Sequence, residues 1–85
     1  MTYAVVFARS AEKEFDRLDS KVARRILPKI KALAQQPRPA GARKLSGTAN
    51  TWRIRIGGYR VVYDILDHKV IVEVLRVRHR REVYL

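Results

Sequence analysis

Arginines at alternating positions are the residues of this chain best suited to chemistry. Arg53 and Arg55 alternate with apolar residues, and Arg60 follows just after the pair Gly57-Gly58. A guanidinium group stays protonated, and its planar fork of donors matches the oxygens of a phosphate. Several such groups on one surface bind a nucleic-acid backbone and stabilise charge that develops on a reacting phosphate. The three arginines therefore predict an anion-binding surface suited to phosphate chemistry.

A β-hairpin over Thr51–Asp67 is the element that must position these arginines. Apolar residues recur with period two on both sides of the Gly-Gly pair, as in half-buried strands. A two-residue turn needs φ > 0, which glycine adopts without steric cost. This turn sets Arg55 opposite Arg60 and Arg53 opposite Val62, and directly opposed residues share a face. The other face then carries the expected core residues, which are Trp52, Ile54, Ile56, Tyr59, Val61, Tyr63 and Ile65.

The end of the chain supplies further candidates. Val77 and His79 have the parity of Arg60 if the last strand stays regular that far. His79 could carry a proton, as histidine side chains do in many sites, and Tyr84 could stack on a base or orient a phosphate. The additional candidate phosphate ligands are Arg78, Arg80, Arg81 and, from another part of the chain, Lys44.

The same residues also fit a purely structural interpretation. Three arginines on one strand face are common on the solvated side of an antiparallel sheet. His79, Tyr84 and Lys44 also fit ordinary surface positions. The chain has no cysteine and two histidines without ligand spacing, so we expect no metal and no cofactor.

Length and charge limit the functional classes. We expect 85 residues to form one domain over residues 1–85. The net charge of +11 is +5 in residues 1–42 and +6 in residues 43–85, which predicts a polyanionic partner, most often a nucleic acid. No apolar run is long enough to span a membrane, and the first residues make a poor signal peptide. The expected location is the cytoplasm.

The predicted fold is α+β in two layers. Two N-terminal helices pack on one face of a mainly antiparallel four-stranded sheet in the order β-α-α-β-β-β, with an additional short edge strand. The first helix is capped by Ser10, and the second contains Pro28, which we expect to kink the helix without ending it. A two-residue turn at Asp67-His68 would set Val70, Val72 and Val74 opposite Ile65, Tyr63 and Val61. The remaining predicted elements are a strand at Thr2–Phe7, an edge strand at Arg43–Leu45 and a last strand at Lys69–Val77.

Three segments resemble a known family. PRPAGARKLSG (37–47), WRIRIGGYRVVYDI (52–65) and VRHRREVY (77–84) are together similar to RelE-type toxins of the RelE/ParE superfamily. The resemblance implies a metal-independent endoribonuclease that enters the ribosomal A site and cuts translated mRNA. In that reaction the 2′-hydroxyl of the RNA attacks the adjacent phosphate and leaves a 2′,3′-cyclic phosphate and a 5′-hydroxyl. The implied partners are a RelB-like antitoxin, the ribosome with its 16S rRNA, the mRNA, and operator DNA through the antitoxin complex.

The resemblance also assigns roles by position. The paired basic residues of the family fall on Arg53 and Arg55, and the arginine of its GYR motif is Arg60. The basic residue near the end of the last strand corresponds to Arg80, with His79 beside it, and the tyrosine of the EVY motif is Tyr84. Some relatives have lysines where this chain has Arg53 and Arg55. Because arginine is a far poorer proton acceptor, His79 is the expected proton carrier.

Two other functions remain open. A ParE-like inhibitor of DNA gyrase would use the same fold without nuclease chemistry, and such chains generally lack the basic residues and tyrosine near the C-terminus. A plain RNA-binding module would tolerate the loss of His79 or of the Tyr84 hydroxyl.

Overall fold

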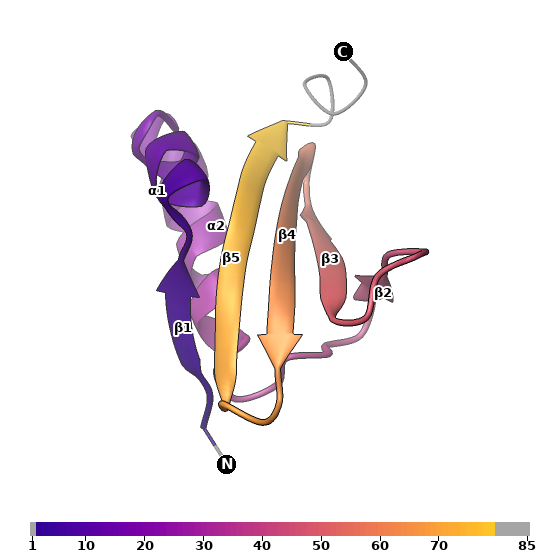
Figure 1. Ribbon diagram of the computed structural model, residues 1–85. Coiled ribbons are helices and arrows are strands. Elements are labelled where there is room, and N and C mark those ends of the chain that lie inside the picture. The colour runs from indigo at the N-terminus through magenta and orange to yellow at the C-terminus, as the bar shows by residue number, and fades with distance from the viewer. Residues whose placement is uncertain (1, 80–85) are drawn as a thin grey trace.

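Residues 2–79 are described by the computed structural model, and they form two helices and five strands (Figure 1). The strands form one sheet in the order β1-β5-β4-β3-β2, in which β1 is parallel to β5 and the other neighbours are antiparallel. The α+β prediction is confirmed, including the short edge strand. The elements are β1 (Ala4–Phe7), α1 (Arg9–Asp16), α2 (Ser20–Ala32), β2 (Arg43–Lys44), β3 (Thr51–Ile56), β4 (Tyr59–Leu66) and β5 (Ile71–His79).

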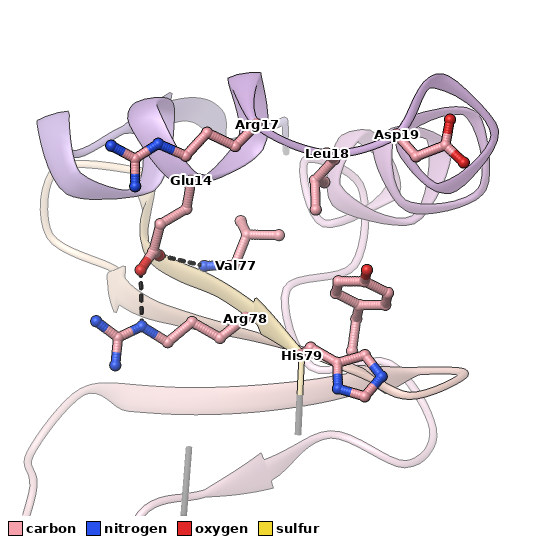
Figure 2. A pocket seen from close by; sticks show the side chains of 8 residues that line it. Glu14, Arg17, Leu18, Asp19, Val77, Arg78 and His79 are labelled. Carbon is pink, nitrogen blue, oxygen red and sulfur yellow. Dashed lines mark hydrogen bonds and ion pairs between the residues drawn. The ribbon is translucent and has the colours of Figure 1, made fainter. Parts of the chain in front are cut away.

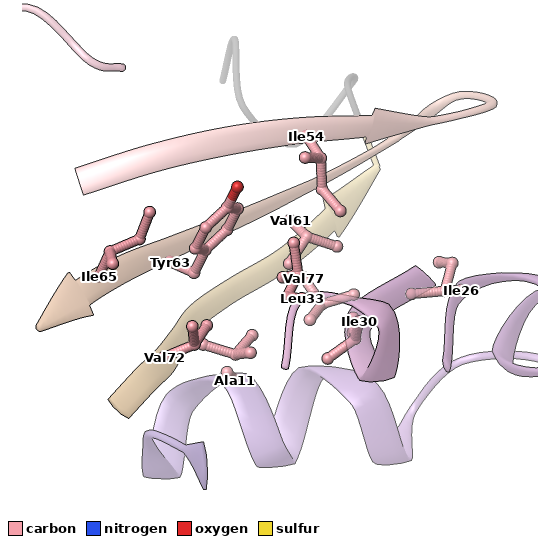
Figure 3. Packing of buried hydrophobic residues seen from close by; sticks show 11 residues of the cluster. Ala11, Ile26, Ile30, Leu33, Ile54, Val61, Tyr63, Ile65, Val72 and Val77 are labelled. Carbon is pink, nitrogen blue, oxygen red and sulfur yellow. The ribbon is translucent and has the colours of Figure 1, made fainter. Parts of the chain in front are cut away.

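The core lies between the two helices and one face of the sheet (Figure 3). Ile26 and Ile30 lie four residues apart on α2, so both point from one side of that helix to the sheet. Burying a side chain of this size stabilises the fold by ~1.5–3 kcal/mol. The fully buried residues that complete the core include Ala11, Leu33, Val61, Tyr63, Ile65, Val72, Val74 and Val77.

The first helix begins at a different residue from the one predicted. The N-cap of α1 is Ala8, so the assignment of Ser10 as the cap is wrong. The Ser10 hydroxyl instead donates a hydrogen bond to the Leu75 carbonyl of β5 at 3.0 Å. As predicted, α2 continues through Pro28. Neither helix in residues 2–79 is long and apolar enough to cross a membrane.

The predicted register of the β3–β4 hairpin is confirmed. Ile56 pairs with Tyr59 across the two-residue turn, and Arg55 pairs with Arg60. Gly57 has φ = 59°, which is the conformation that favours glycine there. The residues expected on the core face lie in the core or pack against it.

The predicted register between β4 and β5 is wrong by two residues. The connection spans four residues, Asp67–Val70, and Val70 itself adopts a positive φ of 56°. The turn is closed by hydrogen bonds from the Lys69 and Val70 amides to the Leu66 and Asp67 carbonyls. Val72 therefore lies opposite Ile65, and Val74 lies opposite Tyr63. The shift is an even number of residues, so both valines still face the core.

Asp67 connects this turn to distant parts of the chain. Its carboxylate accepts hydrogen bonds from the Tyr3 hydroxyl at 2.6 Å and from the Arg38 guanidinium at 2.9 Å. The bond from Arg38 is the main reason that the pKa of Asp67 lies below its ordinary value. The Arg38 guanidinium also lies 5.3 Å from the centre of the Trp52 ring. The connector after α2 is thereby held against the sheet.

Tyr63→Phe should lower the stability of the protein. The buried Tyr63 hydroxyl donates to the Pro37 carbonyl at 2.7 Å, and its loss leaves a buried carbonyl without that donor. We expect the free energy of unfolding, measured with urea at neutral pH, to fall by about 1–2 kcal/mol. Tyr3→Phe, which removes an exposed hydrogen bond, should cost much less. Equal losses in the two variants would contradict this assignment.

The same tyrosine should make stability depend on pH in the alkaline range. Burial raises the pKa of Tyr63 from 10.0 to about 12. The unfolded chain therefore loses the phenol proton at a lower pH than the folded protein does. Stability from this source is complete below pH 10 and is lost as the pH rises through 12. Tyr63→Phe should remove this part of the decline.

Candidate nucleic-acid interface

Two rows of arginines cross the face of the sheet that lies opposite the helices. The two rows contain six arginines, and each of them is at least partly exposed. Adjacent rows are two residues apart along each strand, which corresponds to about 7 Å. The rows span four strands, so they form a surface rather than a line along one strand. The first row is Arg78, Arg60 and Arg55, and the second is Arg76, Arg53 and Arg43, with Val62 between Arg76 and Arg53. We call these six residues the arginine face.

A β-bulge at Leu75 brings β5 into the arginine face. Tyr63 pairs with Val74 and the next residue of β4, Val62, pairs with Arg76, so Leu75 is the extra residue. The bulge reverses the facing of the residues that follow it. The prediction that Val77 and His79 share the face of Arg60 is therefore wrong. Val77 is 2% exposed in the core, and Arg78 is the residue opposite Arg60.

Sequence reasoning missed two members of the arginine face. Arg76 falls on the core side if β5 is regular, and Arg43 was considered only as part of an edge strand. A signal for the bulge was present in the sequence. The valines of the last strand are spaced by two from Val70 to Val74 and by three from Val74 to Val77. A change of spacing from two to three within a strand indicates an inserted residue.

The arginine face covers only the half of the sheet nearest the hairpin turn. In the other half, Asp64 lies opposite Glu73. The Asp64 carboxylate also accepts a hydrogen bond from the Thr51 hydroxyl at 2.6 Å. Because one half of the open face is acidic and the other is basic, a polyanion is attracted to the half near the turn.

A carboxylate from α1 reaches the β5 end of the arginine face (Figure 2). The Glu14 side chain accepts hydrogen bonds from the Val77 amide at 2.9 Å, the Arg78 Nε at 2.7 Å and the Arg76 Nη1 at 3.3 Å. Burial of Glu14 opposes its ionisation, but the bonds from Arg78 and Val77 outweigh it, and the pKa of Glu14 lies below its ordinary value. The group is therefore a carboxylate at neutral pH.

His79 lies on the other side of the sheet from Arg60. It pairs with Tyr59, and the two rings meet edge to face with their centres 5.0 Å apart. Both rings line a cavity of about 450 Å³ under the α1–α2 connection, together with Arg17 and Arg78 (Figure 2). Among residues 2–79, Arg78 is the residue that both lines this cavity and belongs to the arginine face.

The structure separates Lys44 from the arginine face. Lys44 pairs with Trp52, whose side chain packs against the core, and its ammonium group donates to the Thr48 carbonyl. No group of three or more potential metal ligands occurs within residues 2–79. The other three candidates of the sequence, which are Arg80, Arg81 and Tyr84, lie outside the described residues.

The fold and the arginine face together define a small, strongly basic α+β domain with an open sheet face whose charge favours a polyanion. A family model described as "ParE toxin of type II toxin-antitoxin system, parDE" matches residues 5–84. The "mRNA interferase toxin RelE" of Escherichia coli K12 is 38% identical over 99% of this chain and 92% of its own length. The chain therefore belongs to the RelE/ParE superfamily of toxins, and within it to the RelE type.

Solved structures agree with this assignment. The isolated RelE toxin of E. coli superposes with a TM-score of 0.82 at 35% identity, over 96% of this chain and 90% of that one. The toxin chain in the intact E. coli RelBE toxin–antitoxin complex gives a TM-score of 0.80 at 34% identity, over 91% of this chain and 95% of that one.

Arg55→Thr should weaken RNA binding without weakening the fold. Arg55 is exposed and lies opposite Arg60, and like charges at such positions destabilise a strand pair by up to about 1 kcal/mol. We expect unfolding by urea to show equal or higher stability. We also expect the salt dependence of single-stranded RNA binding, log K against log [salt], to become shallower by about 0.7 for the lost phosphate contact.

Arg24→Thr is the matched control, because Arg24 is an exposed arginine on α2. It removes the same charge away from the arginine face and should leave this slope nearly unchanged. If both variants alter the slope equally, RNA is bound by overall charge and the arginine face is not the interface.

Proposed function

We propose that this chain is the toxin of a type II toxin–antitoxin system and acts as an endoribonuclease on translated mRNA. The observation that supports it most is the arginine face on a chain 38% identical to an mRNA interferase toxin. Binding of mRNA in the ribosomal A site, with contacts to 16S rRNA, belongs to the same proposal. The expected cellular location of the protein is the cytoplasm.

The proposed reaction is an internal transfer at one phosphate of the RNA. The 2′ oxygen forms a bond to the neighbouring phosphorus, and the bond from that phosphorus to the 5′ oxygen of the next nucleotide breaks. The 2′-hydroxyl gives up a proton, and the leaving 5′ oxygen gains one. The products are a 2′,3′-cyclic phosphate and a 5′-hydroxyl, so the step consumes no water.

Arg60 is the residue proposed to stabilise the transition state. It lies at the centre of the first arginine row, between Arg78 and Arg55, and its Nε is buried. A fixed guanidinium beside the phosphate favours the negative charge that increases on the non-bridging oxygens. Arg53 and Arg55 would then bind neighbouring phosphates, and Arg80, Arg81 and Tyr84 complete the site by resemblance to the family.

The proton carrier is a separate part of the proposal. His79 lies at the end of the sheet but on the helix side, so the RNA must pass around this end for the imidazole to reach it. If His79 carries a proton, His79→Gln should slow cleavage and change the pH dependence of its rate. Cleavage of an RNA oligonucleotide between pH 5 and 8 measures this, and an unchanged profile would exclude the role.

The proposed protein partner is a RelB-like antitoxin, with operator DNA bound only through the complex of the two. Several similar structures are toxin–antitoxin complexes, among them RelBE of E. coli. An acidic segment of the antitoxin would neutralise much of the +11 charge. Covering the arginine face would then block RNA binding.

Induction of the chain in growing bacteria, followed by mapping of mRNA 5′ ends, tests the activity. We expect growth arrest and new 5′ ends within codons of translated messages. Arg60→Ala should abolish the arrest, because loss of one donor to a developing oxyanion slows a reaction by about 10²–10³-fold. Arg80→Ala should do the same, whereas Arg24→Ala, on the exposed surface of α2, should remain toxic.

A second candidate, inhibition of DNA gyrase, is favoured by the ParE description of the matching family model. It predicts intact mRNA together with a DNA-damage response in the same experiment. If the Arg60 and Arg80 variants both fold and remain fully toxic, the arginine face is not the active surface.

A further inference from the structure

We propose that Glu14 is a positioning residue for RNA binding, whose carboxylate fixes Arg76 and Arg78 at the β5 end of the arginine face. This inference rests on the proposed function, because RNA is taken as the ligand. It assigns a role to an acidic residue of a helix, whereas the proposed RNA ligands are arginines on the strands. It also adds Arg76 to the residues proposed to bind RNA.

Three donors from β5 converge on this one carboxylate. One oxygen accepts the Val77 amide, and the other accepts both guanidinium groups at 2.7 and 3.3 Å. The Glu14 side chain is only 18% exposed, whereas the side chains of Arg78 and Arg76 are 37% and 46% exposed. The carboxylate is thus held under the two arginines, and the arginines remain accessible to solvent.

Helix α1 holds the Glu14 carboxylate in place because it continues from β1 along the edge of β5. β1 ends at Phe7, where it pairs with Val74, so the rest of β5 has no strand partner on that edge. The Ala8 amide binds the Val74 carbonyl at 2.8 Å, and the Ser10 hydroxyl binds the Leu75 carbonyl at 3.0 Å. Glu14 follows Ser10 by four residues on the same side of the helix. The bulge and both arginines are therefore attached to α1.

Fixed arginines bind phosphate better than mobile ones. A long side chain loses rotamer freedom when it contacts a ligand, and this loss opposes binding. Glu14 removes much of that freedom for Arg78 and Arg76 before the RNA arrives. Glu14 engages one nitrogen of Arg76, and a guanidinium has five N–H donors, so the same group can still bind a phosphate oxygen.

The alternative is that Glu14 acts only as a negative charge near the RNA. These two roles predict effects of opposite sign. If charge alone matters, removing the carboxylate strengthens RNA binding, as it would for any acidic residue of this basic protein. If Glu14 positions the arginines, removing it weakens binding although the protein becomes more positive.

The experiment measures binding of the full chain to a short single-stranded RNA with 2′-O-methyl groups, which cannot undergo attack by a 2′-hydroxyl. Fluorescence anisotropy over a range of salt concentrations gives the affinity and its salt slope. For Glu14→Gln we expect about five- to tenfold weaker binding and a slope shallower by up to about 1.4, equivalent to two lost phosphate contacts on single-stranded RNA. The matched control is Glu12→Gln, an exposed residue of the same helix, and it should bind slightly more tightly.

A double-mutant cycle separates positioning from general structural damage. In a chain that already carries Arg76→Ala and Arg78→Ala, Glu14→Gln should no longer weaken binding. Glu14→Asp keeps the charge but shortens the side chain, so it also should weaken binding, and it serves if the glutamine variant does not fold. Urea unfolding confirms that each variant is folded under the assay conditions.

Tighter binding by Glu14→Gln, or a loss that persists without Arg76 and Arg78, would overturn the inference. The proposed function is tested separately, by inducing the unmodified chain and the Arg60→Ala variant in growing bacteria. If Arg60→Ala is non-toxic while Glu14→Gln binds more tightly, only the role of Glu14 fails. If the unmodified chain arrests growth while translated mRNA stays intact, the RNA-cleaving function itself fails.

Discussion

The register of β4 with its two neighbours is the constraint on which the rest of the structure depends. β4 is hydrogen-bonded to β3 on one side and to β5 on the other. A shift of one residue in either pairing would send every side chain of the shifted strand to the opposite face. The two-residue turn at Gly57-Gly58 fixes the first pairing, and the bulge at Leu75 adjusts the second. Only this combination places arginines of both neighbours beside Arg60.

The core selects this register even though the arginines oppose it. Val61, Tyr63 and Val77 are almost completely buried on the core face, and each such side chain stabilises the fold by ~1.5–3 kcal/mol. A directly opposed pair of like charges costs less than about 1 kcal/mol. Burial therefore outweighs the repulsion between Arg55 and Arg60, and the fold keeps a charge arrangement that its own stability does not favour. Such an arrangement is consistent with the proposed binding of a polyanion on this face.

The sequence predicted the parts of the site that depend on local rules. The β3–β4 register followed from two glycines, because few loops of that length are sterically allowed. The prediction for the β4–β5 connection was wrong because Asp67-His68 does not determine a loop length. The observed turn needs a positive φ at Val70. The contact between Glu14 and Arg78 joins residues 64 positions apart. No local pattern encodes such a contact, so only the packing of α1 against β5 reveals it.

A bound polyanion would change the energy of the arginine face as a whole. Strand pairing sets Arg60 directly opposite both Arg55 and Arg78, and Arg53 directly opposite Arg43. A phosphate placed between two such arginines replaces repulsion with two attractive contacts. The acidic pair Asp64 and Glu73 in the other half of the face disfavours the same anion there. Because the ligand binds the folded protein and relieves its repulsion, binding and stability are coupled. An acidic antitoxin segment and an RNA would relieve the same repulsion, which explains how a protein partner could compete with the substrate without resembling it in shape.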